Sequence, residues 1–517
     1  MAKVNLDALI PREDLEIIEQ NNNMTNNLFT SIKIPDFESG FVYPFLRKPD
    51  FQRETNEWDK KKICEFLESF SNGDLIPSII LWRSNSGFYF VIDGSHRLSA
   101  LISWINDDYG DGEISKKFYD GNIPEEQKII SEETRKLINR KIGAYQNIKN
   151  SLTENGNTKH IEIAKGLSAY VIQVQWVTGD VKKAEQSFFK INQQGVALNN
   201  TEKKLLESRN KGNCIAARAI KTGGKGHKYW ANFNADIQNE IQSISEEVNK
   251  CLFTPPLIGP VKSPDLPIAG KISSAQTMPL ILDFVNITNK IPADFKTSIN
   301  EDKTGHDTLT YLKKVRKVVW RINSNHLSSL GLHPLVYFYT LEGRHKPASF
   351  YASAEFIYEL ERTNKFNDFI EVRKSFEDFL LKYNYLPQQI TEKYKFAVKS
   401  YKHIASMYML LIDILKTDKN IDTAATSLCG NKNFNYLKIN QELSNNNDVF
   451  LDFTNETKSA VFIKEALNNP IRCGICNGLI HQNSITVDHI TRKQDGGIGS
   501  VDNGQLAHPY CNSTFKN

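Results

Sequence analysis

In the first part of the chain, the pattern of apolar and polar residues predicts both strands and helices. Further along, it predicts mainly helices. Residues 87–92 are a run of β-formers, and from Ser95 onward apolar residues recur at helical spacing through Leu98, Leu101 and Trp104. This pattern predicts a strand, a turn and a helix, with Ser95 as the helix N-cap.

The middle of the chain becomes helical after a proline-rich break at residues 254–267. One apolar stripe includes Leu309 and Val319, a second spans residues 369–380, and a third helix is predicted from Tyr394 to Leu415. Lysines and arginines fill much of the surface around the first stripe. They leave two interpretations, a helix that faces DNA and an ordinary solvated face, and the pattern favours the solvated face.

Composition places the chain among ordinary globular proteins. Its 517 residues suffice for two to four domains, and a net charge of +4 permits nucleic-acid binding without requiring it. Four of the seven cysteines, Cys64, Cys214, Cys251 and Cys429, are widely scattered, which is typical of a reducing compartment. No stretch approaches the roughly 18 apolar residues that span a bilayer. We therefore expect a cytoplasmic protein without membrane association.

Two pairs of soft ligands lie near the C-terminus. Cys473 with Cys476, and His508 with Cys511, are each three positions apart, a spacing that lets a tight turn direct both side chains at one ion. The four side chains predict a tetrahedral Zn²⁺ site. One alternative is a zinc knuckle that only stabilises the fold.

The segment between these pairs carries residues suited to hydrolysis. Residues 485–487 are β-branched and predict a short strand that ends at Asp488 and His489. A neutral imidazole at His489 can accept a proton from water, and the Asp488 carboxylate can bind a hard cation such as Mg²⁺. Gly496–Gly497 permits a sharp turn of the loop that follows. The Asn503 amide can fix this loop by hydrogen bonding to its backbone.

Cys-x-x-Cys, Asp-His, Gly-Gly, Asn and Cys-Asn followed by Lys516 together resemble the zinc-containing HNH, or ββα-metal, endonucleases over residues 471–517. The resemblance implies that His489 is the general base and that Asn503 orients the loop. It also implies that Asp488 and Asn512 bind Mg²⁺ or Mn²⁺, while the two pairs hold structural Zn²⁺. Two positions depart from the family pattern, His508 where Cys is usual and Asn512 where His is common.

A second candidate site lies in the turn Asp93-Gly94-Ser95-His96-Arg97. Backbone N–H groups at the start of a helix and the guanidinium of Arg97 can together hold a phosphate. The alternative is an ordinary capped helix with histidine and arginine at its surface.

This turn, the upstream Phe-Gln-Arg element and a downstream segment around Asn192 resemble the ParB/sulfiredoxin-like domain of GmrSD-type modification-dependent restriction enzymes, over about residues 10–210. The resemblance implies binding and hydrolysis of a nucleoside triphosphate, with GTP, ATP and CTP all open. The residues that it places in the pocket are Gln52, Arg53, Asp93, Gly94, His96, Arg97 and Asn192.

These observations predict an α+β protein in three parts. Residues 1–215 form a ParB-like nucleotide-binding domain with a helical insertion at about 106–160, and residues 216–430 a mostly helical middle domain. Residues 431–517 form a connector and an HNH nuclease with its core at 471–517.

The favoured function is a nucleotide-regulated endonuclease that nicks or cleaves foreign, modified phage DNA in bacterial defence. Its expected partners are double-stranded DNA and a nucleoside triphosphate, and a homodimer would allow both strands to be cut. Two alternatives stay open. One is a ParB-like, nucleotide-switched DNA-binding regulator with a purely structural zinc unit, and the other is an HNH nuclease that acts on RNA.

Overall fold

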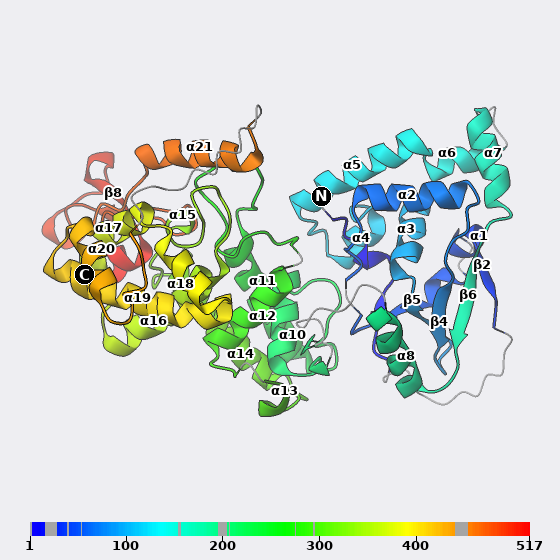
Figure 1. The fold of residues 1–517 in the computed structure, drawn as a ribbon, viewed down its shortest axis with the longest axis horizontal. Coiled ribbons are helices and arrows are strands. Elements are labelled where there is room, and N and C mark those ends of the chain that lie inside the picture. Colours follow the sequence, from blue (N-terminus) through cyan, green and yellow to red (C-terminus); the bar gives the residue numbers. More distant parts are fainter. Residues whose placement is uncertain are drawn as a thin grey trace. The chain divides into compact units, whose positions relative to one another are not determined.

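The computed structural model divides into two compact units, which Figure 1 colours along the sequence. Unit 1 contains Met1–Arg209 with Lys225–Ala231, and unit 2 contains Asn210–Gly224 with Asn232–Asn517. The helical middle and the C-terminal motif therefore lie in the same unit. The structure describes residues 3–15, 28–38, 41–52, 54–152, 157–194, 204–205, 207–274, 276–292, 295–439 and 453–516.

Unit 1 is built on a six-stranded mixed sheet in the order β1-β3-β5-β4-β6-β2. Strand β5 pairs in parallel with β3 and antiparallel with β4, and β4 pairs in parallel with β6. The strands are β1 (Arg12–Glu13), β2 (Ser31–Lys33), β3 (Leu46–Pro49), β4 (Ile79–Arg83), β5 (Tyr89–Asp93) and β6 (Val171–Val177).

Helices surround this sheet, and several of them occupy the region predicted as an insertion. The helices of unit 1 are α1 (Ile34–Glu38), α2 (Lys60–Ser71), α3 (Ser95–Ile105), α4 (Glu113–Phe118), α5 (Glu125–Lys141), α6 (Tyr145–Asn150), α7 (Thr158–Leu167) and α8 (Val181–Gln194). Short 3-10 turns lie at Asp7–Leu9 and Tyr43–Phe45.

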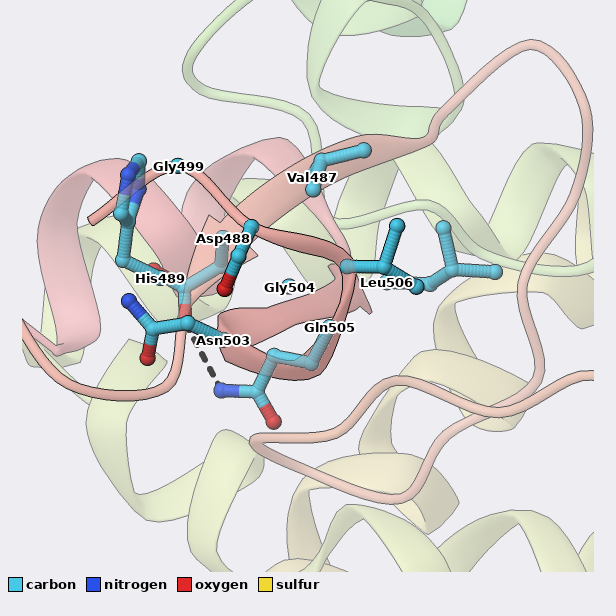
Figure 2. A pocket seen from close by; sticks show the side chains of 10 residues that line it. Val487, Asp488, His489, Gly499, Asn503, Gly504, Gln505 and Leu506 are labelled. Carbon is cyan, nitrogen blue, oxygen red and sulfur yellow. Dashed lines mark hydrogen bonds between the residues drawn. The ribbon is translucent and has the colours of Figure 1, made fainter. Parts of the chain in front are cut away.

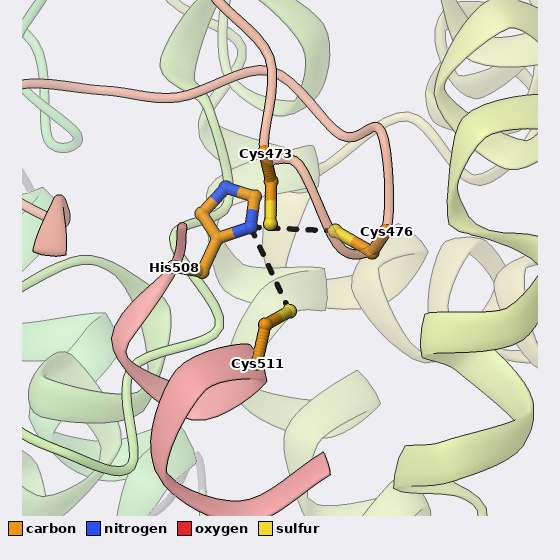
Figure 3. Close-up of side chains that lie close together, drawn as sticks. All are labelled: Cys473, Cys476, His508 and Cys511. Atoms are coloured by element: carbon orange, nitrogen blue, oxygen red, sulfur yellow. Dashed lines mark hydrogen bonds between the residues drawn. The ribbon is translucent and has the colours of Figure 1, made fainter. Parts of the chain in front are cut away.

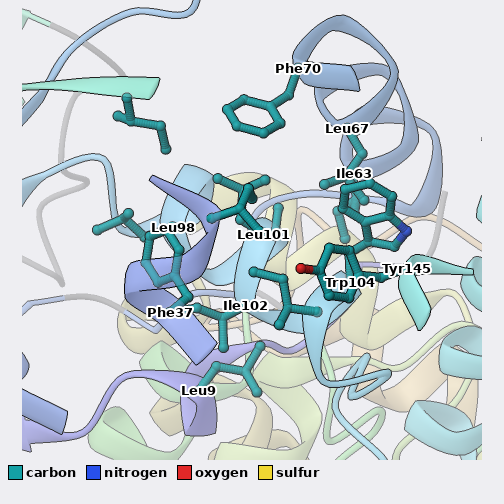
Figure 4. Packing of buried hydrophobic residues seen from close by; sticks show 14 of the residues in the cluster. Leu9, Phe37, Ile63, Leu67, Phe70, Leu98, Leu101, Ile102, Trp104 and Tyr145 are labelled. Atoms are coloured by element: carbon teal, nitrogen blue, oxygen red, sulfur yellow. The ribbon is translucent and has the colours of Figure 1, made fainter. Parts of the chain in front are cut away.

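The main core of unit 1 forms around α3, whose apolar side chains are buried (Figure 4). Leu98 and Leu101 belong to one cluster with Phe70 of α2, and the Trp104 indole donates a hydrogen bond of 3.0 Å to the Gly143 carbonyl. This packing explains why the apolar periodicity identified the helix. Burial of α3 also fixes the turn that precedes it.

The predicted strand, turn and helix are confirmed, but the predicted N-cap is wrong. Gly94 is the N-cap, with a φ of 99°, and Ser95 is the first helical residue. A Cβ at Gly94 would lie 2.5 Å from Cγ2 of Ile79, so both the left-handed backbone and the close approach require glycine.

Unit 2 is mainly helical, with a two-stranded antiparallel sheet near the C-terminus. Its helices are α10 (Gly212–Thr222), α11 (Ala235–Phe253), α12 (Thr277–Thr288), α13 (Phe295–Ser298), α14 (His306–Ile322), α15 (Pro334–Tyr337), α16 (Pro347–Thr363), α17 (Phe366–Lys382), α18 (Leu386–Tyr394), α19 (Ala397–Thr417), α20 (Ile421–Gly430) and α21 (Asn455–Asn468). The strands are β7 (Thr486–His489) and β8 (Gly504–Ala507), followed by a π-helix at Cys511–Phe515.

Helix α14 buries the first apolar stripe, and ion pairs link basic residues beside that stripe to neighbouring helices. Lys313 lies 2.7 Å from Glu240 of α11, and Lys317 lies 3.4 Å from Glu361 of α16. These two pairs partly neutralise the basic surface of α14.

The third predicted helix begins later than the periodicity indicated. Tyr394 ends α18, Lys395 adopts a φ of 67°, and α19 begins at Ala397. The left-handed residue breaks the backbone hydrogen-bond ladder between two apolar segments, which side-chain periodicity cannot reveal. Within the described ranges, no helix combines the length and apolar character needed to cross a membrane.

His333 is a buried imidazole whose protonation state affects the stability of unit 2. Its Nδ1 atom accepts a hydrogen bond of 3.3 Å from the Leu335 N–H, and its ring packs edge-on against His481. Burial lowers the pKa of His333 well below its ordinary value of 6.5, and the positive charge of Arg373 acts in the same direction. The folded protein therefore holds this imidazole neutral.

Acidification should destabilise unit 2 through His333. The unfolded imidazole binds a proton below about pH 6.5, whereas the folded one does not. The contribution of His333 to the free energy of unfolding is therefore fully present above that pH. Below it, this contribution falls by about 1.36 kcal/mol per pH unit. His333→Asn keeps an acceptor for Leu335 and should flatten this dependence in urea unfolding between pH 7 and 5. His306→Asn, at an exposed position, is the control, and equal slopes for both variants would contradict the assignment.

Candidate functional site

Four buried side chains converge near the C-terminus (Figure 3). The ligand atoms of Cys473, Cys476, His508 and Cys511 all lie within 4.8 Å of one another, and Nδ1 of His508 is 3.4 Å from Sγ of Cys476. Three sulfurs and one imidazole nitrogen suit tetrahedral Zn²⁺, so the cluster supports a structural zinc site.

A hydrogen bond to the backbone fixes the orientation of the His508 ring. Its Nε2–H donates a hydrogen bond of 2.9 Å to the Leu479 carbonyl, which directs Nδ1 at the sulfur atoms. Gly331 packs against the ring with a φ of 62°, and a Cβ there would lie 2.4 Å from Cδ2 of His508. The zinc cluster is therefore in contact with the loop that precedes α15.

A buried ion pair on α17 joins this loop to the cluster. Nε of Arg373 donates a hydrogen bond of 2.9 Å to Glu377, and the guanidinium also donates to the carbonyls of Leu330 and Gly331. The second Glu377 oxygen accepts a hydrogen bond of 2.7 Å from the Leu479 N–H. Both charged side chains are fully buried. The pair therefore connects α17 to the segment that holds the zinc ligands.

The strands β7 and β8 form a hairpin that carries the predicted catalytic residues. Asp488 pairs with Gln505 in register, and His489 pairs with Gly504. Oδ2 of the buried Asp488 accepts hydrogen bonds from Nε2 of Gln505 at 2.8 Å and Nζ of Lys516 at 2.7 Å. Lys516 also donates to the His489 carbonyl.

The Asn503 side chain holds the loop that follows β7. Its oxygen accepts a hydrogen bond of 2.7 Å from the Thr491 N–H, and its nitrogen donates to the carbonyls of Thr491 and Ile498 at 3.1 and 2.8 Å. A Cβ at Gly497 would lie 1.9 Å from the Thr491 carbonyl oxygen. Gly497 thus allows the chain to return close to Thr491, and the Asn503 amide links Thr491 to Ile498.

An open pocket of about 510 Å³ lies beside the hairpin (Figure 2). Asp488, His489 and Asn503 line it, and His489 is half-buried. The other lining residues are Val487, Gly499, Ser500, Val501, Gly504, Gln505 and Leu506. Asn512 does not line this pocket. Its Nδ2 donates to Oγ1 of Thr486 at 3.3 Å and to the Val487 carbonyl at 3.4 Å, and these contacts hold the amide against β7.

The predicted N-terminal site brings several of its residues together at the turn before α3. Arg97 donates hydrogen bonds of 2.8 Å to Asp93 and 3.1 Å to the Ser78 carbonyl, and Gln52 donates to Ser95 at 3.4 Å. Among the described residues, neither Nε of Arg97 nor Oε1 of Gln52 has a hydrogen-bond partner, although both atoms are buried. Each of these two atoms leaves a hydrogen-bonding position that a bound ligand would satisfy.

The other predicted residues of this site differ in their surroundings. His96 stacks on Trp58 at 5.6 Å and accepts a hydrogen bond from the Glu57 N–H, so its ring faces its neighbours within unit 1. Arg53 and the side chain of Asn192 lie outside the described part of the chain. Their predicted roles stay predictions.

A buried charge network supports the segment that carries Gln52. Asp7 accepts hydrogen bonds from Arg12 and, at 2.8 Å, from Nζ of Lys48, and Arg12 also donates to the Gln52 carbonyl. Burial lowers the pKa of Lys48 to about 8 despite the neighbouring Asp7 carboxylate. Sequence reasoning missed this network because its hydrogen bonds from Lys48 to Asp7 and from Arg12 to Gln52 join residues 41 and 40 positions apart.

The comparisons with known proteins match both ends of the chain. The family model described as the GmrSD restriction endonuclease N-terminal domain matches residues 26–208, and the HNH endonuclease model matches residues 473–517. The chain thus fuses a GmrSD-type N-terminal domain to a C-terminal HNH endonuclease domain, and both resemblances are confirmed. Together these domains support a restriction-type DNA endonuclease. No curated protein and no solved structure matches the chain.

Loss of one partner of the buried α17 pair should destabilise unit 2 strongly. Glu377→Leu leaves the Arg373 charge buried without its carboxylate, which typically costs about 3–5 kcal/mol. Lys374→Gln on the same helix breaks the exposed pair with Asp378 and should cost at most about 1 kcal/mol. Urea unfolding of zinc-loaded protein measures both values. Similar losses in the two variants would show that the buried pair has no special role.

Proposed function

We propose that the protein is a metal-dependent endonuclease that nicks double-stranded DNA at the C-terminal pocket. The observation that carries this proposal is that Asp488 and His489, consecutive residues of β7, both line one open pocket. Such a pocket can admit a phosphodiester while the hairpin keeps both side chains in fixed positions.

His489 acts as the general base that removes a proton from the attacking water. Its backbone is held by pairing with Gly504 and by the hydrogen bond from Lys516, while its ring remains half-exposed at the pocket. Asn503 keeps the adjoining loop closed and so limits the space around the imidazole.

A carboxylate from Asp488 and an amide oxygen from Asn512 are hard donors that fit Mg²⁺ or Mn²⁺. When bound, such an ion stabilises the negative charge that develops on the phosphate. The buried sulfur and imidazole cluster takes Zn²⁺ instead, because soft donors select it. One such centre cuts one strand, so cleavage of both strands requires two protomers.

The N-terminal domain binds and hydrolyses a nucleoside triphosphate, and nucleotide occupancy regulates cutting. The helix start at Gly94, the guanidinium of Arg97 and the buried oxygen of Gln52 support this assignment. The match to the GmrSD N-terminal domain supports a role in bacterial defence, with foreign, modified phage DNA as the target.

Replacement of the proposed base should abolish cutting. We expect His489→Ala to lower the rate of supercoiled-plasmid nicking with Mg²⁺ by about 10²–10⁴-fold, the usual contribution of general-base catalysis. Gln494→Ala, an exposed change in the adjoining loop, should cut at the wild-type rate. Equal activity of wild type and His489→Ala would reject the assignment.

Parallel reactions distinguish the alternative functions. Cleavage of tRNA but not plasmid would indicate an RNA nuclease. DNA binding without cleavage in any divalent metal would indicate a regulator with a purely structural zinc unit.

Loss of the Arg97 guanidinium should weaken nucleotide binding. Hydrogen bonds to charged groups contribute about 1.5–3 kcal/mol, so Arg97→Met should raise the Kd of the preferred nucleotide about tenfold or more. Titration of fluorescent GTP, ATP and CTP analogues measures this change. Lys136→Met, at an exposed position of α5, should bind like wild type, and unchanged affinity in Arg97→Met would contradict the pocket assignment.

A further inference from the structure

The two carboxylate oxygens of Asp488 have different surroundings. Oδ2 accepts both hydrogen bonds, from Gln505 and from Lys516, whereas no described residue donates a hydrogen bond to Oδ1. The carboxylate is nearly buried, so these bonds fix its rotation. Oδ1 is therefore the oxygen that remains for a cation.

Lys516 is held at both its side chain and its backbone. The ammonium contacts the Asp488 carboxylate and the His489 carbonyl, and the Arg492 guanidinium donates a hydrogen bond to the Lys516 carbonyl. Only 16% of the lysine side chain is exposed. These contacts hold its positive charge beside the proposed metal ligand rather than in solvent.

This arrangement sets the charge of the metal site. Asp488 contributes one negative charge, Lys516 contributes one positive charge, and the Asn512 and Gln505 amides are neutral. The formal sum is zero. A divalent cation gains little from a neutral site in water, because hard cations depend on anionic oxygens to replace their hydration. The phosphodiester of DNA supplies the missing negative charge.

We infer that Lys516 is a positioning residue that makes divalent-metal binding depend on bound DNA. With Gln505 it presents a single oxygen of Asp488, and its charge disfavours the metal until a phosphate enters the pocket. This inference rests on the proposed nuclease function. It explains how a centre with one carboxylate can avoid holding a reactive ion in the absence of substrate.

The probe is Mn²⁺, and electron paramagnetic resonance measures its affinity for the full-length, zinc-loaded protein. The His489→Ala background keeps a short DNA duplex uncut. In that background, DNA should tighten Mn²⁺ binding at least about tenfold. Adding Lys516→Met should tighten binding without DNA by on the order of tenfold, because one nearby positive charge is lost, and should therefore shrink the effect of DNA.

Two controls separate this role from general electrostatics and from misfolding. Lys493→Met removes an exposed charge from the neighbouring loop, where screening is strong, and should change Mn²⁺ affinity much less. Zinc content and the unfolding midpoint verify that each variant is folded. Lys516→Arg retains the charge and should retain weak binding without DNA.

Thermodynamic reciprocity gives a second readout. Mn²⁺ must strengthen DNA binding, followed by fluorescence anisotropy, by the same factor by which DNA strengthens Mn²⁺ binding. Equal Mn²⁺ affinities of the Lys516→Met and Lys493→Met proteins would overturn the inference. Failure of the wild type to cut any plasmid would reject the nuclease proposal instead, and the two failures are therefore distinguishable.

Discussion

The buried ion pair between Arg373 and Glu377 is the interaction on which the C-terminal half of the structure depends. Removing two charges from water is costly, so the pair is favourable only because its hydrogen-bonding groups are satisfied. The backbone at Leu330, Gly331 and Leu479 supplies those partners. Three segments far apart in the chain are consequently held at one point, directly behind the zinc cluster.

This constraint makes the HNH endonuclease domain part of the helical unit rather than a separate module. Leu479 lies between the two zinc-ligand pairs, and its carbonyl orients His508. The Tyr510 N–H also donates to the Ser329 carbonyl at 3.0 Å, and Ser329 and Ser484 hydrogen bond through their hydroxyls. A displacement of α17 or of the loop before α15 would therefore shift the hairpin that presents His489.

The sequence predicts those parts of the site in which the functional residues lie close together along the chain. Cys473 and Cys476 are recognisable because two soft ligands three apart have few other uses, and Asp488 with His489 follows a clear β-branched run. The pattern of Cys-Asn followed by Lys516 was part of the resemblance to HNH endonucleases. It could not indicate that Lys516 contacts Asp488, because that contact depends on how the last helix packs against β7.

Long-range pairs were missed for the same reason. Arg373 and Glu377 lie on an apolar stripe four residues apart, a signal for a buried pair, but their partners at Leu330 and Leu479 depend on tertiary packing. Boundaries set by left-handed residues were also missed. Gly94 replaced Ser95 as a cap because a close approach to Ile79 decided the backbone, not the capping preference.

Hydrogen exchange measured by mass spectrometry on zinc-loaded and zinc-depleted protein tests the central claim most directly. If the cluster and the α17 pair form one structural unit, zinc removal will reduce protection in β7 and β8 and equally in α17, while β4 and β5 of unit 1 keep theirs. Loss of protection confined to the C-terminal hairpin, with α17 unchanged, would contradict the account.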